Sequence, residues 1–480
     1  MFMSAIEGTI VATAMPSIAG SLGGFALYAW VFAAYLLVQA VTTPMFGKAA
    51  DLVGRKPVFI AGVTVFMVGS LLCGFAPSMP WLIGFRLLQG LGAGAVQPVT
   101  STLAGDLYAF HERARVQGWL SSVWGLSAVA GPLAGGLIVE RFHWGWIFWA
   151  NLPFGFLAIA LVALFLHESV ERRPRSIDAL GAAAFTVAVG SAMVVFTQGA
   201  ALPPGIVVGL AALSLTAGTL FWWHEGRAAE AIIPPEVWRD PLVRWANLAT
   251  LGAGAVMIAV VAYLPTYAQG VLGTSALVAG FTLTTMSMGW PVASVLAGVL
   301  MVRLGVRRVA RVGSLALLAG SLAFAFMDPS RGPGYAAASS ALIGVGMGTL
   351  STTFLVSIQT RVGWRLRGTA TATNLLMRIL GNALGAAILG GLVNASLLRW
   401  LQREGLAGAV RLDDVTRLLD GNTATSEPLL EVVRGGLQGA LHAAFLAMAV
   451  AAALTVAFAF LMPDLPAGQR DDGEAPVTES

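Results

Sequence analysis

Long apolar stretches alternate with short polar breaks along almost the whole chain. A helix needs about 20 predominantly apolar residues to cross the hydrocarbon core of a bilayer, and stretches of that length recur fourteen times. The candidate spans are residues 1–18, 28–49, 57–75, 79–103, 117–139, 146–166, 179–198, 204–223, 245–267, 277–302, 310–327, 336–357, 369–397 and 437–461. The pattern predicts an all-α integral membrane protein with fourteen transmembrane helices.

The composition also places the chain in lipid. Hydrophobic residues make up 57% of its 480 positions and charged residues 11%, whereas about a quarter of the residues of a soluble protein are charged. The net charge of +4 does not indicate nucleic-acid binding, because the cations lie in short breaks between apolar stretches. The histidines have no metal-ligand spacing, and the single cysteine, Cys73, lies in an apolar stretch. We therefore expect no nucleic-acid partner, no metal and no cofactor.

Lysine and arginine are distributed unevenly between the two sides of the predicted spans. The breaks after even-numbered spans hold most of them, while the short breaks after odd-numbered spans hold only Arg141 and Arg331. By the positive-inside rule this predicts a plasma-membrane protein (inner membrane where a cell has two) with both termini in the cytoplasm. The first span has no basic leader or cleavage site, so we expect it to be retained. It begins almost at Met1, which suggests a start codon upstream.

A charged turn between two apolar stretches occurs twice. The first copy reads Gly47-Lys-Ala-Ala-Asp51-Leu-Val-Gly54-Arg55-Lys56. An eroded copy extends from Gly298 to Arg308, with Val302 in place of the aspartate. Pro16 of span one and Gly131 of span five have counterparts in Pro265 of span nine and Gly385 of span thirteen. Spans one to six therefore match spans nine to fourteen.

The repeat predicts two six-helix bundles with an inserted helix pair between them. Bundles related by an axis along the membrane normal are one route to a transporter whose site lies at their interface. We expect a first bundle over residues 1–170, the inserted pair and linkers over 171–240, and a second bundle over 241–465. The second bundle is expected to contain a long outer loop at about 399–436, and residues 466–480 to form a disordered cytoplasmic tail.

Four motifs, each in the expected span, resemble those of the major facilitator superfamily. They are the charged turn at 47–56, Arg86-Leu-Leu-Gln89-Gly90 in span four, Gly131-Pro132-Leu-Ala-Gly135-Gly136 in span five, and Glu7-Gly-Thr-Ile-Val-Ala-Thr-Ala-Met-Pro16 in span one. The fourteen-span count and the span-five motif resemble its drug:proton antiporter family, which carries out multidrug efflux. The resemblance covers nearly the whole chain. It implies two major facilitator bundles and transport that is driven by a proton gradient.

Glu7 is the only acid of the first six spans that lies clearly away from a water boundary. An ionised side chain near the bilayer centre costs about 2.5 to 3.5 kcal/mol on insertion scales, and burial favours the neutral acid. Reversible proton binding is what proton coupling requires. The resembled family carries an acid at this position, usually Asp, which implies a coupling role for Glu7. The alternative is that Glu7 extends to the cytoplasmic water and has no such role.

Arg86 shares one helix face with Gln89 and Gln97. A polar stripe on a membrane helix is expected to face protein or water rather than lipid. The family resemblance links this arginine to proton transfer; the alternative is an arginine that extends to the outer interface. The residues of span twelve that match Arg86 and Gln89 are Ser340 and Ile343. We therefore expect charged residues with a role in transport to be confined to the first half.

Two motifs bear on conformational change. The residues Gly47, Asp51, Gly54, Arg55 and Lys56 are expected to form a gate that is made in one conformer and broken in another, although an orientation signal alone would also explain them. In span five, small residues permit close helix contact and proline bends the helix axis. The family resemblance makes Gly131, Pro132, Gly135 and Gly136 an export motif; ordinary small-residue packing is the alternative.

These observations favour a proton-coupled exporter of amphipathic compounds, aromatic or cationic in character, that works by alternating access. The expected partners are protons, small amphipathic substrates and the lipid bilayer; an accessory efflux protein is neither indicated nor excluded. A dedicated exporter of a single metabolite or antibiotic, or an importer, is the first alternative, and a multispan membrane enzyme or sensor the second. Polar or aromatic groups within spans are the candidates for lining a substrate cavity: Gln39, Gln89, Gln97, Trp124, Asn151 and Asn374.

Overall fold

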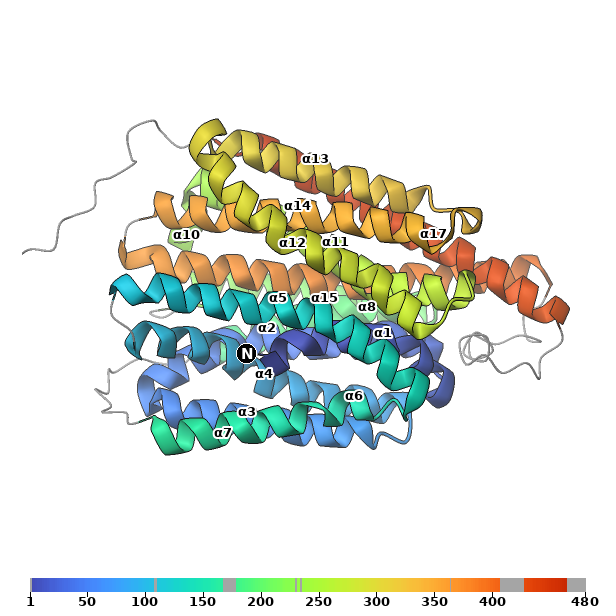
Figure 1. Cartoon of the computed structure of the whole chain (residues 1–480), viewed down its shortest axis with the longest axis horizontal. Helices are drawn as coiled ribbons and strands as arrows, with labels where there is room; N and C mark the ends of the chain where they lie inside the picture. The colour runs from blue at the N-terminus through green and yellow to red at the C-terminus, as the bar shows by residue number, and fades with distance from the viewer. Residues whose placement is uncertain are drawn as a thin grey trace, which may run out of the picture.

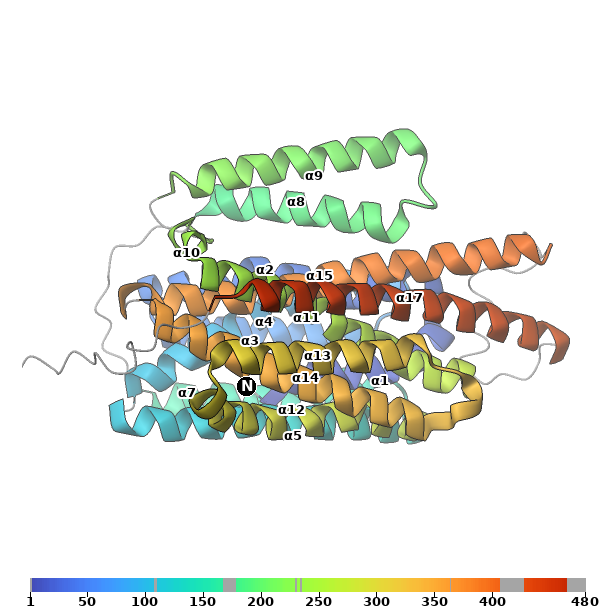
Figure 2. The ribbon, with the colours of Figure 1, turned by 90° about the horizontal axis from the view of Figure 1, so that it is seen from above.

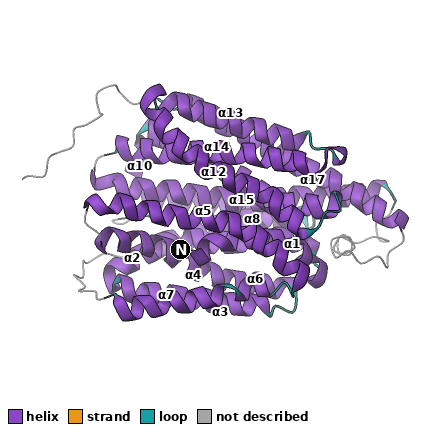
Figure 3. Ribbon diagram, viewed as in Figure 1, coloured by secondary structure: helices purple, strands orange, loops and turns teal. Residues whose placement is uncertain are grey.

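The computed structural model is helical throughout the part of the chain that it describes. It describes residues 2–107, 110–166, 178–228, 231–233, 235–362, 364–405 and 427–463. Within these ranges the regular structure is helix, joined by short loops (Figure 3). Twelve of the described helical segments are long and apolar enough to cross a membrane. An all-helical membrane protein is therefore confirmed.

The helices occur in three groups along the chain. The first group is α1 (Phe2–Leu22), α2 (Tyr28–Val53), α3 (Arg55–Gly74), α4 (Met79–Leu107), α5 (Phe110–Arg141), α6 (Trp146–Trp149) and α7 (Asn151–Phe165). The middle group is α8 (Ala179–Gln198), α9 (Pro204–Glu225) and α10 (Pro235–Arg239). The last group is α11 (Pro241–Thr266), α12 (Ala276–Leu304), α13 (Val306–Ala325), α14 (Gly332–Arg361), α15 (Trp364–Arg403) and α17 (Glu427–Leu461).

The first and last groups repeat one packing arrangement. In the first, α3 and α2 pack on α4, α1 packs on α5, and α3 packs on α7. In the last, α13 and α12 pack on α14, α11 packs on α15, and α13 packs on α17. We call the two groups the first half and the second half. They lie on opposite sides of the molecule in Figure 1 and meet along two seams, where α5 packs on α12 and α15 packs on α2.

The helix pair α8–α9 stands apart from both halves. Figure 2 shows it as a separate layer on the side of α2 and α15, and α8 packs on both of these helices. Asp178 begins α8 by accepting a hydrogen bond from the Gly181 amide at 2.8 Å, and its carboxylate also contacts His224 of α9 at 2.7 Å. This contact ties the two helices together at one end.

The turns at Gly54 and Gly305 have the same backbone conformation. Gly54 separates α2 from α3 with φ 113° and ψ 153°, and Gly305 separates α12 from α13 with φ 83° and ψ 157°. Positive φ is costly for any residue other than glycine. The repeat therefore keeps glycine at this turn, although the nearby Asp51 is replaced by Val302 in the second copy. We call the end of the molecule that holds these turns the turn end, and the opposite end the far end.

Several helices are longer than hydropathy predicts. The long loop expected at 399–436 is wrong at both ends, because α15 continues to Arg403 and α17 begins at Glu427. Hydropathy detects only the apolar part of a helix, and both helices extend into polar sequence. Residues 406–426 and the tail at 466–480 lie outside the described residues. Helices α4 and α5 span 29 and 32 residues and are not among the twelve segments that meet the apolar criterion.

Candidate functional site

Glu7 and Arg86 form a fully buried ion pair inside the first half. Arg86 Nη1 lies 2.5 Å from Glu7 Oε1, and the two side chains are 1% and 0% exposed. Figures 1 and 2 both place the start of α1 within the length of the bundle rather than at its end. The alternatives in which Glu7 extends to the cytoplasmic water and Arg86 to the outer interface are therefore wrong for this structure.

Further polar groups hold this pair from four other directions. Asn151 of α7 donates to Glu7 Oε2 at 2.6 Å, so both carboxylate oxygens have partners. Arg86 donates through Nε to the Val31 carbonyl of α2 at 3.0 Å and through Nη1 to Gln89 Oε1 at 2.6 Å. Gln89 in turn donates to Ser70 of α3 at 2.7 Å. Five helices therefore converge on one charge pair.

The surroundings of the pair explain what it can do. The Arg86 guanidinium also lies 4.1 Å from the centre of the Tyr35 ring. Removing one partner from a buried pair leaves an uncompensated charge, which costs several kcal/mol (about 3–5 in soluble proteins). A proton on Glu7 would cancel its charge and leave Arg86 attracted only by neutral acceptors. The pair can therefore exist in two charge states with different preferences for the packing around them.

The remaining cavity candidates lie in three different environments. Gln89 and Asn151, proposed to line a substrate cavity, instead contact the ion pair. Asn374 of α15 donates to Asn247 and Thr250 of α11, both at 2.9 Å. Gln39 on α2 is buried and Gln97 on α4 half-buried, and the side chain of Trp124 lies outside the described residues. The five candidates whose side chains are described lie in different environments and share no common site.

The span-five motif lies where α5 contacts both α1 and the other half. A Cβ on Gly131 would collide with the Thr9 side chain, and one on Gly135 would lie 2.9 Å from the Ile10 carbonyl oxygen. On the opposite side, a Cβ on Gly136 would lie 2.8 Å from the Ala276 carbonyl oxygen of α12. Pro132 belongs to the same contact, because its carbonyl closely approaches Gly280. Small residues are thus required on both faces, and the motif forms part of a seam.

The charged turn is attached to its own half. A Cβ on Gly47 would lie 3.9 Å from Pro98 of α4, an ordinary contact. Lys56 donates to the Ala163 and Leu166 carbonyls at 2.8 and 2.9 Å and so caps the end of α7. Arg55 is the first residue of α3. The side chain of Asp51 lies outside the described residues, so its expected part in a gate stays a prediction.

Hydrogen bonds between the halves are described at the far end. Tyr28 of α2 donates to the Ala262 carbonyl of α11 at 2.9 Å. Asn394 of α15 donates to the Ala26 carbonyl at 2.8 Å. Glu140 of α5 accepts from the Leu277 amide of α12 at 2.9 Å. These contacts hold the two halves together at the end of the molecule away from the glycine turns.

Arg378 of α15 is a charged residue within a span that the sequence reasoning did not single out. It lies inside the predicted span 369–397, so charged residues occur within spans of both halves, and the expectation that functional charges are confined to the first half stays a prediction. A search for cations as well as acids within spans would have found it. The comparison of Arg86 with Ser340 tested one pair of repeat positions and could not detect a charge elsewhere in the repeat.

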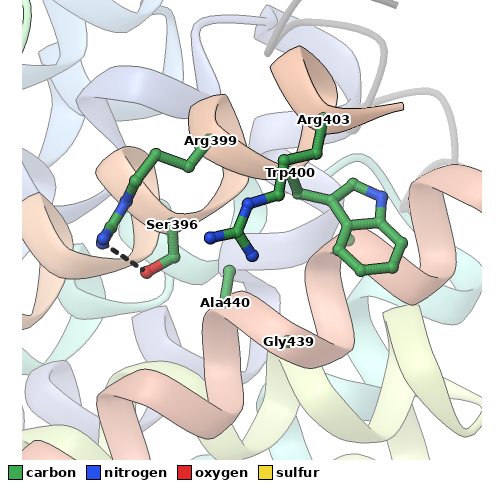
Figure 4. A pocket seen from close by; sticks show the side chains of 7 residues that line it. Ser396, Arg399, Trp400, Arg403, Gly439 and Ala440 are labelled. Atoms are coloured by element: carbon green, nitrogen blue, oxygen red, sulfur yellow. Dashed lines mark hydrogen bonds between the residues drawn. The ribbon is translucent and has the colours of Figure 1, made fainter. Parts of the chain in front are cut away.

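A small cavity lies near the far end, between α15 and α17. It has a volume of about 250 Å³ and is lined by Arg399, Trp400 and Arg403 of α15 and by Gly439 and Ala440 of α17 (Figure 4). Arg399 bonds within its own helix, to the Ala395 carbonyl and to Ser396. None of the five predicted cavity residues whose side chains are described lines this space.

Comparison with known proteins settles the family. The sequence model of the family described as Major Facilitator Superfamily matches residues 1–386. The chain belongs to the major facilitator superfamily. It is therefore a multi-pass membrane transporter rather than the membrane enzyme or sensor considered as an alternative.

Sequence relatives and solved structures agree with this assignment. The chain is 33% identical over 398 residues to the multidrug transporter protein MdtP of Bacillus subtilis (strain 168), covering 82% of this chain and 74% of that protein. Multidrug resistance protein 3 of the same strain is 33% identical over 393 residues, covering 81% and 77%. A bacterial homolog of the human lysosomal transporter Spinster, in an inward-facing and unoccupied conformation, aligns with a TM-score of 0.68 at 17% identity, covering 96% and 95%. At that identity the likeness shows the fold alone.

Proposed function

We propose that this transporter exports amphipathic compounds in exchange for protons, with Glu7 and Arg86 as the coupling pair. The buried pair is the observation that carries the proposal, because a neutralisable acid held against a fixed cation couples proton binding to packing across five helices. The two Bacillus subtilis relatives, both named for multidrug transport or resistance, support the cargo class. The proton gradient supplies the driving force without a cofactor.

We also propose that α4 and α5 cross the membrane, which brings the number of spans to fourteen. Their lengths of 29 and 32 residues exceed the 20 or so residues needed to cross the hydrocarbon. Arg86 and the glycine motif lower their apolar character but lie against other helices. With the Lys- and Arg-rich breaks in the cytoplasm, the turn end faces inward and the far end outward, in the plasma membrane or its inner-membrane equivalent.

The mechanism follows from this orientation. The contacts of Tyr28, Asn394 and Glu140 close the outward end, and cargo enters from the inside while Glu7 is ionised. Rocking of the halves breaks these contacts and opens the outward end. A proton then binds Glu7 from outside, weakens its attraction to Arg86 and favours return. A potential of 100 mV contributes about 2.3 kcal/mol per elementary charge moved, enough for roughly fifty-fold accumulation.

Everted membrane vesicles test the coupling. Addition of an exported dye to energised vesicles is expected to dissipate part of the pH gradient when the wild-type chain is present. Glu7→Gln keeps the hydrogen-bonding shape but cannot exchange a proton, so we expect the dye-dependent change in pH to disappear. Glu431→Gln is the matched control, because this carboxylate lies exposed at the start of α17. Full proton exchange in Glu7→Gln would remove Glu7 from the mechanism.

A further inference from the structure

Arg378 occupies a position deep within a membrane-spanning helix of the second half. It follows the first residue of α15, Trp364, by fourteen positions, or about 21 Å along the helix axis. At this level of α15 the neighbouring helix α11 has reached Gly254, near its own midpoint, where a Cβ would lie 2.5 Å from the Arg378 carbonyl oxygen. An ionisable residue at such a depth is expensive and usually marks a functional site.

Arg378 lies on the face of α15 that packs against α11. Asn374, one turn earlier, bonds to Asn247 of α11. Gly385, two turns later, lies so close to α11 that a Cβ would be 2.8 Å from the Ala255 Cα. Residues four and seven apart share a helix face. The arginine is therefore on a protein-facing side of the helix and is half-buried.

The hydrogen-bonding groups around Arg378 include several without partners. Within the described part of the chain, the Arg378 side chain makes no hydrogen bond, ion pair or aromatic contact, although a guanidinium has five N–H donors. Asn247 is fully buried, and its Nδ2 has no acceptor among the described residues. Asn382, one turn after Arg378, likewise has a buried Oδ1 without a partner. Buried polar groups are normally satisfied, so this cluster has unused capacity that is mostly of the donor type.

Arg378 also determines the net charge of the membrane interior. Away from span ends, the sequence has one acid, Glu7, and Arg86 neutralises it. Arg378 has no carboxylate of the described chain against it. A cationic compound approaching the Arg378 side chain would meet repulsion and no counter-charge, whereas an anion would find a guanidinium suited to carboxylate, sulfonate or phosphate groups.

We propose that Arg378, with Asn382 one turn after it and Asn247 opposite Asn374 one turn before it, forms a subsite for the acidic group of an amphipathic organic anion. This inference rests on the proposed export function and names its cargo class, replacing the cationic class expected from the sequence. The repeat places Trp124 at the register position of Arg378, because Gly131 and Gly385 each follow by seven residues. Export of an anion is further favoured by a membrane potential that is negative inside.

Two dyes with the same three-ring skeleton and opposite charge test the proposal. Fluorescein is an anion and rhodamine 123 a cation, so their comparison isolates charge from size. Binding to the purified full-length chain in detergent is followed by quenching of tryptophan fluorescence. The wild-type chain is expected to bind fluorescein more tightly than rhodamine 123. Arg378→Gln is expected to weaken fluorescein binding about tenfold or more, because a hydrogen bond to a charged group is lost, while leaving rhodamine 123 binding equal or stronger.

Further variants separate recognition from folding. Arg378→Lys keeps the positive charge but lacks the planar guanidinium, so it should bind fluorescein more tightly than Arg378→Gln and less tightly than the wild type. Asn382→Leu should also weaken fluorescein binding and leaves the arginine in place. Arg399→Gln is the matched control, since it removes a cation from the exposed far end of the same helix. Tighter binding of rhodamine 123 by the wild type, or unchanged fluorescein binding in both Arg378→Gln and Asn382→Leu, would overturn the proposal.

Transport in everted vesicles distinguishes this inference from the export function itself. If fluorescein binding depends on Arg378 but neither dye exchanges for protons, the anion subsite stands and proton-coupled export fails. If rhodamine 123 is exported in exchange for protons while fluorescein is neither bound nor moved, export stands and the subsite fails. If fluorescein is exported and the rate falls in Arg378→Gln but not in Arg399→Gln, both stand.

Discussion

The two halves of this transporter share a backbone arrangement and differ in their polar interiors. Both have a glycine turn with positive φ, at Gly54 and Gly305, and both pack their first helix on their fifth through glycine. The first half holds an ion pair of Glu7 with Arg86, whereas the equivalents in the second half are Val256, nine residues before Pro265, and Ser340. The second half has Arg378 instead. The repeat has preserved what the backbone requires, while the charged residues within spans lie at different positions in the two halves.

The largest difference between the halves is expected when the ion pair is broken. Arg86→Met leaves Glu7 buried without its cation, a change that costs about 3–5 kcal/mol in soluble proteins. Ser340→Ala, at the matching position, should cost less than about 1 kcal/mol, because the Ser340 hydroxyl has no partner among the described residues. Thermal unfolding in detergent measures both.

A double variant sharpens this test. In Glu7→Gln/Arg86→Met the stranded charge is absent, so part of the lost stability should return. The single cysteine, Cys73, is fully buried, so a thiol-reactive dye should label the chain only as it unfolds. Equal unfolding temperatures for Arg86→Met and Ser340→Ala would show that the pair does not stabilise the first half.

Glycine contacts between the first and fifth helices of each half should give the next largest effects. Gly131→Ala and Gly385→Ala each insert a methyl group into a close contact, which typically costs about 1–3 kcal/mol. The larger loss is expected for Gly385→Ala, because its nearest neighbour is the Ala255 backbone, whereas Gly131 meets the Thr9 side chain. Gly8→Ala is the control, with open space around its Cβ. The same unfolding assay ranks the three variants; a loss in Gly8→Ala as large as the others would contradict the argument.

The two turns should respond equally to substitution. An alanine at Gly54 or Gly305 must adopt a positive φ with an extended ψ, a region that essentially only glycine occupies, which costs about 1–3 kcal/mol. Gly298→Ala, near the second turn but inside α12, in open space and without positive φ, should not lower stability, because alanine favours a helix more than glycine does. Unequal losses of stability would show that the turns differ in more than side-chain charge.

The smallest difference is expected for the basic residues that follow each turn. Lys56→Met loses the hydrogen bonds to the end of α7 and should cost about 0.5–1.5 kcal/mol. Arg307, two residues after Gly305 as Lys56 is after Gly54, has a buried Nε without a partner among the described residues. Arg307→Met should therefore cost less than Lys56→Met, and a reversed order of unfolding temperatures would contradict this.

The architecture could be predicted from the sequence because hydrophobic length and repeated glycines are local signals. The inserted pair, the repeat and the positions of the glycine turns all follow from such signals. Pairings between distant helices do not. Nothing in the apolar stretch around Asn151 indicates which face of α7 points inward, so the sequence predicts a place in a cargo cavity for Asn151 and not its contact with Glu7. Arg378 was visible in the sequence, but only packing against α11 shows that it faces protein without a counter-charge.

The position of α8 and α9 makes the transporter's surroundings unequal on its two sides. Because α8 lies across both α2 and α15, one seam is shielded from acyl chains by two further helices, and the α5–α12 seam lies on the side opposite that layer (Figure 2). We expect a compound dissolved in the inner leaflet to enter sideways along that unshielded seam when rocking separates the halves. The route from lipid to binding site would then be one-sided, even though the protein around it is a duplicated fold.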